Sequence, residues 1–196
     1  MRPRVPRGVR ERDVDGQRVG IAVVVAHGDG GGGVIITVAR RDEGGGGVDG
    51  AITRAGGELL AEKRLALPVH HNKRCKTGDA VITSGGPFDA LKCDCVIHAV
   101  GPDYRRLPPA KEDEDDDLAR GDSILRNAYA AAMKRAKEQK CKTVAFSLLS
   151  AGIFRGRQSL DNVLRAAVDA IGDATYPGLQ RVHLVAFSGK EQEALG

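Results

Sequence analysis

Aromatic residues are scarce in this chain of 196 residues: tryptophan is absent, and aromatic side chains make up only 4% of the sequence. A buried core must therefore be built from valine, isoleucine, leucine and alanine rather than from stacked rings. Such residues are typical of parallel strands that are covered on both faces. With 41% hydrophobic and 29% charged residues, the chain is long enough for one soluble domain and short for two.

Long hydrophobic runs are also missing. No apolar run approaches the length of a membrane span, so no membrane partner is expected. The basic start is not followed by an apolar segment before Val19, and a secretory signal is therefore not predicted. We expect a cytoplasmic protein, with a nuclear or organellar location left open.

Metal-binding patterns are absent as well. The chain has four cysteines, and none of them has the spacing of a zinc site. They are expected to be free thiols with structural roles, and they are Cys75, Cys93, Cys95 and Cys141. His70 and His71 are adjacent, without further ligands at suitable spacing. Neither a metal nor another cofactor is predicted.

Charge is unevenly distributed. The formal net charge is +4, and much of the excess comes from arginines within the first 18 residues, which are Arg2, Arg4, Arg7, Arg10, Arg12 and Arg18. We expect residues 1–18 to be a basic, disordered tail and residues 19–196 to be a single domain. The tail could contact nucleic acid, an alternative that the near-neutral remainder of the chain does not favour.

Short apolar runs alternate with longer amphipathic segments from Val19 onward, which indicates an α/β fold. Strands are predicted over residues 21–26, 34–39, 80–83, 95–100, 142–149 and 182–187. Helices are predicted over residues 51–67, 123–139 and 159–171, the first beginning near Asp49. The six acidic residues from Glu112 to Asp117 are expected to form a solvated loop.

Two small-residue loops follow predicted strands and precede predicted helices. The first is the glycine run Gly44, Gly45, Gly46 and Gly47. Glycines let backbone amides approach a ligand, and a helix amino end favours a phosphate. The second is the segment from Ser150 to Gly156, which could face the same ligand. Neither run matches a Walker loop or a dinucleotide fingerprint, so phosphoryl and hydride transfer lose support.

Four segments, in order, resemble the macro domains, which bind ADP-ribose and in some branches remove it from proteins. They are Gly44 to Ile52, Thr77 to Thr83, Val96 to Pro102 and Ser150 to Phe154. The resemblance extends over about residues 19–195. It implies a three-layer α/β/α sandwich with a mixed central sheet, and ADP-ribose or ADP-ribosylated protein as partner.

The resemblance also implies a set of site residues. The diphosphate would lie on Gly44 to Gly47 with Val48, and on Ser150, Ala151, Gly152, Ile153 and Phe154, with the Phe154 ring near the distal ribose. Phe187 would stack on adenine, and Asp29 would accept a hydrogen bond from the adenine amino group. A core aromatic for Phe187 and a turn aspartate for Asp29 are equally open interpretations. Asp49 would position or activate a water, unless it only complements the helix dipole.

The chain departs from the family beside the distal ribose. Where the family has Asn-Ala-Ala-Asn, this sequence has Thr37-Val38-Ala39-Arg40. Arginine has no acceptor and cannot replace an asparagine oxygen. Thr53 stands where some hydrolytic relatives carry histidine. The sequence therefore predicts ADP-ribose binding with hydrolysis of ADP-ribosyl groups as one outcome and a non-catalytic reader as the alternative.

Overall fold

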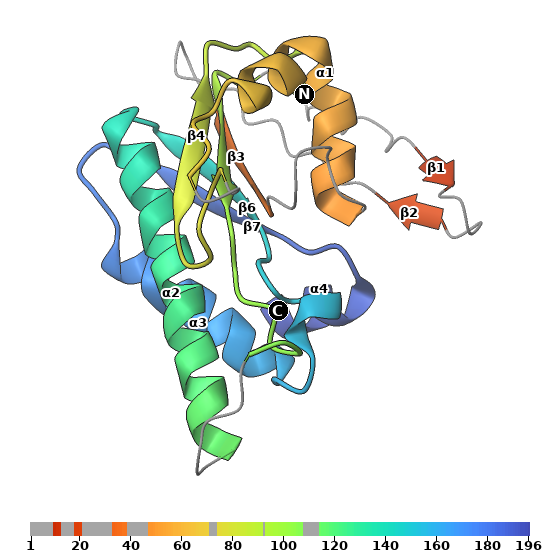
Figure 1. Cartoon of the computed structure of the whole chain (residues 1–196), viewed down its shortest axis with the longest axis vertical. Coiled ribbons are helices and arrows are strands. Elements are labelled where there is room, and N and C mark those ends of the chain that lie inside the picture. Colours follow the sequence, from red (N-terminus) through yellow and green to blue (C-terminus); the bar gives the residue numbers. More distant parts are fainter. Residues whose placement is uncertain are drawn as a thin grey trace, which may run out of the picture.

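The computed structural model describes residues 10–12, 18–20, 33–38, 47–70, 74–91, 93–107 and 114–196. Its main sheet has five strands (Figure 1). In spatial order these are β4 (Ala80–Ser84), β5 (Cys95–Ala99), β3 (Gly33–Val38), β6 (Thr143–Ser147) and β7 (Arg181–Val185). The strand β4 runs antiparallel to β5, and the other neighbours are parallel. The mixed α/β sheet predicted from the sequence is confirmed.

Two further strands, β1 (Arg10–Arg12) and β2 (Arg18–Gly20), form a separate antiparallel pair. The strand predicted over residues 21–26 lies outside the described residues. The division into a tail and one domain at residue 18 therefore stays a prediction. The remaining predicted strands are all present, with ends that differ by one or a few residues.

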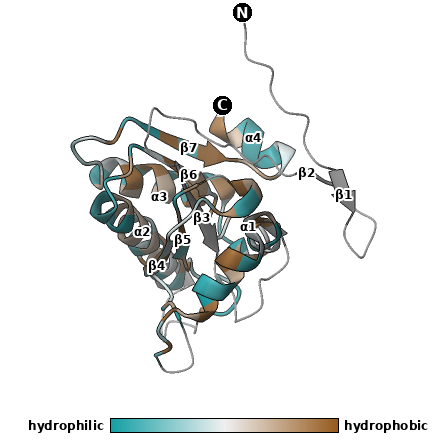
Figure 2. Ribbon diagram, turned by 90° about the horizontal axis from the view of Figure 1, so that it is seen from above, coloured by the Kyte–Doolittle hydropathy of each residue, from teal (hydrophilic) through white to brown (hydrophobic). Residues whose placement is uncertain are grey.

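Helices cover both faces of the sheet, which gives three layers (Figure 2). The helices α2 (Glu114–Glu138) and α3 (Leu160–Asp173) pack against each other on one face. On the other face lies α1 (Gly47–Leu65), which contacts β3, β4 and the short 3-10 helix η1 (Asp89–Leu91). Two shorter elements are the 3-10 helix η2 (Ile153–Arg155) and the terminal helix α4 (Gly189–Leu195).

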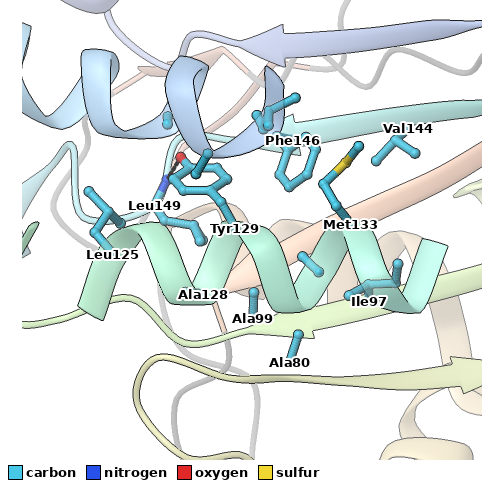
Figure 3. Packing of buried hydrophobic residues seen from close by; sticks show 14 of the residues in the cluster. Ala80, Ile97, Ala99, Leu125, Ala128, Tyr129, Met133, Val144, Phe146 and Leu149 are labelled. Atoms are coloured by element: carbon cyan, nitrogen blue, oxygen red, sulfur yellow. Dashed lines mark hydrogen bonds between the residues drawn. The ribbon is translucent and has the colours of Figure 1, made fainter. Parts of the chain in front are cut away.

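The larger core lies between the sheet and the helices α2 and α3 (Figure 3). Its aromatic pair is Tyr129 and Phe146, whose ring centroids are 5.3 Å apart. The Tyr129 hydroxyl accepts a hydrogen bond from the Leu149 amide at 2.9 Å, which satisfies a buried polar group. Mostly aliphatic residues and alanine fill the rest, as the scarcity of aromatic residues predicts.

The start of α2 corrects one prediction. The sequence placed this helix from residue 123 and treated the acidic run as a solvated loop, but the helix begins at Glu114. Acidic side chains suit the first turn of a helix, because the helix dipole is positive there. Asp117 is buried and pairs with Arg120 at 2.9 Å. Much of the acidic run therefore belongs to the helix rather than to a loop.

Candidate functional site

The carboxyl ends of β3, β5, β6 and β7 lie at one edge of the sheet, because these four strands are mutually parallel. The segments that follow them in the chain therefore start from the same edge. They carry the second loop after β6, Phe187 after β7 and the residues from Gly101 to Arg105 after β5. In open α/β sheets, ligands bind at this edge.

The second loop is held in an unusual backbone conformation. Ser150 has a φ of 57°, in the left-handed region, and its side chain is buried. Its hydroxyl donates to the carbonyl oxygen of Pro102 at 2.7 Å. The Tyr104 amide donates to the carbonyl oxygen of Phe154 at 2.9 Å. The segment after β5 thus fixes the loop at both of its ends.

The middle of this loop is open. A Cβ atom placed on Gly152 would meet nothing within 4 Å, and Ile153 is 72% exposed. The φ of Gly152 is −87°, so the backbone does not require glycine through a positive φ. Free space at this glycine is what a closely approaching ligand needs.

Asp49 lies in the first turn of α1 and is buried, with 4% of its surface exposed. Its Oδ1 atom accepts from Nη2 of Arg64 at 3.2 Å. The other guanidinium nitrogen, Nη1, donates to Oγ1 of Thr53 at 2.5 Å, and this hydroxyl donates to the Asp49 carbonyl at 2.9 Å. The carboxylate charge is therefore balanced within the protein.

A break in α1 makes this ion pair possible. Along a straight helix, residues 49 and 64 would lie about 22 Å apart. Gly57 interrupts the helix with a φ of 62° and a ψ of −163°, and the two halves run in different directions (Figure 1). A Cβ at Gly57 would also lie 2.8 Å from Oδ2 of Asp89. The glycine therefore lets the second half of α1 bring Arg64 back to Asp49.

His98 on β5 is buried near this cluster. Its Nε2 atom lies 3.0 Å from Oγ1 of Thr83, whose hydroxyl donates to the Val96 carbonyl. With the Thr83 proton given to Val96, the tautomer of His98 that carries its proton on Nε2 donates to Thr83. Burial, with a smaller contribution from the charge of Arg64, lowers the pKa of His98 to about 3.

The burial of His98 leads us to expect that the stability of the protein depends on pH. The pKa of His98 in the folded protein lies below the ordinary value of 6.5. Its contribution to the free energy of unfolding is therefore fully present above pH 6.5 and is lost as the pH falls toward 3. Between pH 6.5 and 5.5, the free energy of unfolding should fall by up to about 1.4 kcal/mol per pH unit from His98. Urea unfolding of the wild type and of His98→Gln should show a flatter slope in the variant. The exposed His70 supplies the control, since His70→Gln should keep the wild-type slope; equal slopes for His98→Gln would refute the assignment.

Phe187 is partly exposed, at 46%, just beyond the end of β7. Oε2 of the buried Glu191 accepts from the amides of Phe187 and Ser188 at 2.6 and 2.9 Å. The Ser188 hydroxyl oxygen accepts a hydrogen bond from the Glu191 amide at 3.3 Å, which completes a capping box at the start of α4. The backbone of Phe187 is thus fixed while its side chain is exposed, so a core position is excluded.

The remaining predicted site residues belong to the first glycine loop and its surroundings, and the structure describes only some of them. Asp29 and Gly44 to Gly46 lie outside the described residues, while Gly47 and Val48 are the first two residues of α1. Val48 packs against the smaller core on the α1 face. The part that the first glycine loop plays stays a prediction. The second loop, Phe187 and the loop after β5 are brought to one edge.

Sequence reasoning missed three positions that shape the site: Arg64, Arg105 and Glu191. The pattern Ser188-Gly-Lys-Glu191 is typical of a capping box and could have predicted the start of a helix. The adjacent glycines Gly56 and Gly57 inside a helical pattern could have predicted a break in that helix. The partners of Arg64 and Arg105 had no such signal, because they depend on how separate segments pack.

Within the described part of the chain, no three histidine, cysteine, aspartate or glutamate side chains are grouped to hold a metal ion. All four cysteines are described, and none is in a disulfide. Among the helices described, none has the length and apolarity needed to cross a membrane.

The fold is a three-layer α/β/α sandwich, and its loops follow the carboxyl ends of the parallel strands. Proteins of this class bind their ligands at those strand ends. Residues 37–167 match the model of the Macro domain family. The chain therefore belongs to the Macro domain family, as the sequence motifs predicted.

Similar proteins come from several bacteria. The chain is 36% identical over 148 residues to a macro domain-containing protein of Streptomyces coelicolor, covering 75% of this chain and 78% of that protein. It is 38% identical over 149 residues to O-acetyl-ADP-ribose deacetylase 1 of Pantoea vagans, covering 74% and 77%. Among solved structures, the Oceanobacillus iheyensis macrodomain with ADP matches at a TM-score of 0.66 and 28% identity, covering 83% of this chain and 82% of that one. A mutant of that macrodomain with ADPR matches at 0.63 and 26%.

Proposed function

We propose that this domain binds ADP-ribose, free or attached to protein, at the carboxyl edge of its sheet. The observation that carries the proposal is that the open loop around Gly152 and the exposed Phe187 follow two parallel strands that end at this edge. A glycine loop suits a diphosphate and an exposed, backbone-fixed ring suits adenine. Similarity to the Oceanobacillus iheyensis macrodomain with ADP, and to a mutant of the same macrodomain with ADPR, supports the same ligand class.

We further propose that the site removes ADP-ribose from an acceptor by hydrolysis. Water would supply a hydroxyl to one fragment and a proton to the other as the bond to the acceptor breaks. Asp49 would orient that water, since a carboxylate accepts its hydrogen. Similarity to an O-acetyl-ADP-ribose deacetylase favours this activity. A non-catalytic reader is favoured instead by the pairing of Asp49 with Arg64 and by the missing asparagines before the glycine run.

Calorimetric titration with ADP-ribose tests the binding proposal. We expect a saturable heat with one ligand per chain at micromolar to millimolar concentrations. AMP should bind more weakly, because it lacks the second phosphate and the distal ribose. Absence of heat with millimolar ADP-ribose, in protein whose circular dichroism shows a folded α/β domain, would refute the proposal.

A further inference from the structure

The loop after β5 carries an arginine whose arrangement is unusually well fixed for an exposed side chain. The side chain of Arg105 is 35% exposed, and its guanidinium carbon lies 5.3 Å from the centroid of the Phe154 ring. A guanidinium over a ring face at this distance is an attractive cation–π contact. Phe154 belongs to the second loop, so this contact joins two segments of the candidate site.

Asp103 holds the guanidinium in place. Its Oδ1 accepts from Nε of Arg105 at 2.8 Å and its Oδ2 accepts from Nη2 at 2.7 Å, which is a bidentate pair. Asp103 Oδ1 also lies 3.2 Å from the Arg105 amide, which donates to it. The hydrogen bond from Arg105 is the main cause that lowers the pKa of Asp103. The pair is therefore fully charged at neutral pH.

The aliphatic part of Arg105 is fixed as well. A Cβ placed on Gly156 would lie 2.9 Å from Cγ of Arg105 and 3.2 Å from its amide nitrogen. Gly156 has a φ of 56°, so glycine suits both the backbone and the close approach. Arg105 thus extends along the second loop, with its stem against Gly156 and its charged end over Phe154.

We propose that Arg105, oriented by Asp103, is a positioning residue that sets the preference of this site for ADP-ribose over ADP. The inference rests on the proposed function, with the Phe154 ring beside the distal ribose as the family resemblance implies. ADP lacks that ribose, so it gains nothing from a fixed Phe154. If the ring is already held in place, binding costs less conformational entropy in the loop. This lower cost favours ADP-ribose, which contacts the ring, over ADP, which does not.

The experiment compares the affinities of ADP-ribose and ADP in matched variants. Arg105→Ala should weaken ADP-ribose binding by roughly five- to tenfold and leave ADP binding within about twofold. Arg105→Lys keeps a charge without the planar bidentate pair and should give an intermediate loss. Arg106→Ala is the control: Arg106 is 77% exposed and lies 3.7 Å from the same carboxylate, and both affinities should be unchanged.

A double-mutant cycle separates positioning from direct contact with the ligand. In a Phe154→Leu background, Arg105→Ala should cause no further loss of ADP-ribose affinity if Arg105 acts through the ring. A loss of the same size as in the wild type would show direct contact and overturn the proposal. So would an equal loss for ADP and ADP-ribose, or no loss for either.

A measurement without ligand keeps this inference distinct from the proposed function. Backbone NMR relaxation should show more motion on the nanosecond timescale at residues 153–155 in Arg105→Ala than in Arg106→Ala. If the wild type binds neither nucleotide, the proposed function fails and the ADP-ribose preference fails with it. If the wild type binds but relaxation and affinity are unchanged in Arg105→Ala, the positioning role alone is wrong.

Discussion

Replacing Gly152 with glutamate should remove ADP-ribose binding while leaving the fold intact. A side chain at this position meets no protein atom near its Cβ, so the free energy of unfolding should change by less than about 1 kcal/mol. The same space is where the diphosphate is proposed to approach, and a carboxylate there adds repulsion between like charges. We expect a loss of affinity of at least roughly 100-fold, measured by calorimetry.

Two matched variants make this result interpretable. Gly152→Gln has nearly the same shape without the charge, and a similar loss would show that bulk alone blocks the site. Gly172→Glu makes the same substitution at another glycine with no atom within 4 Å of a built Cβ, near the end of α3. It should bind like the wild type. Normal ADP-ribose affinity in Gly152→Glu would place the diphosphate elsewhere.

Replacing Asp49 with asparagine should abolish release of ADP-ribose from a modified acceptor while binding persists. Loss of a residue that orients or activates water typically lowers rates by roughly 100- to 10,000-fold. The amide oxygen of asparagine can still accept from Arg64, so this variant should lose less stability than one without an acceptor at this position. Asp49→Ala leaves Arg64, whose side chain is only 15% exposed, without this acceptor. This variant should cost about 2 kcal/mol of unfolding free energy.

The control for Asp49 is another aspartate in the first turn of a helix. Asp161 occupies that place in α3 and is exposed, so Asp161→Asn should change neither rate nor binding. Single-turnover release and ADP-ribose titration should be measured on all three proteins. Equal rates in the wild type and Asp49→Asn would remove Asp49 from the mechanism. Binding without any release by the wild type would identify a reader.

The local sequence pattern was sufficient to predict most of the helices and strands that the structure describes. The predicted strands within the described region and the helix predicted over residues 159–171 appear where short apolar runs and an amphipathic segment placed them. The prediction failed at the start of α2, because a run of acidic residues indicates a solvated loop by repulsion but also suits the positive end of a helix. The terminal helix α4 was missed, although Ser188 and Glu191 cap it within four residues.

The sequence by itself determined the family, the α/β class and the second loop, because these depend on the order of residues within short segments. Only the tertiary structure decided that Asp49 pairs with Arg64 and that Arg105 lies over Phe154. The first contact needs a helix broken at Gly57, and the second needs the loops after β5 and β6 to meet at one sheet edge. Neighbours in space such as these are set by chain direction and packing, which no single stretch of sequence encodes.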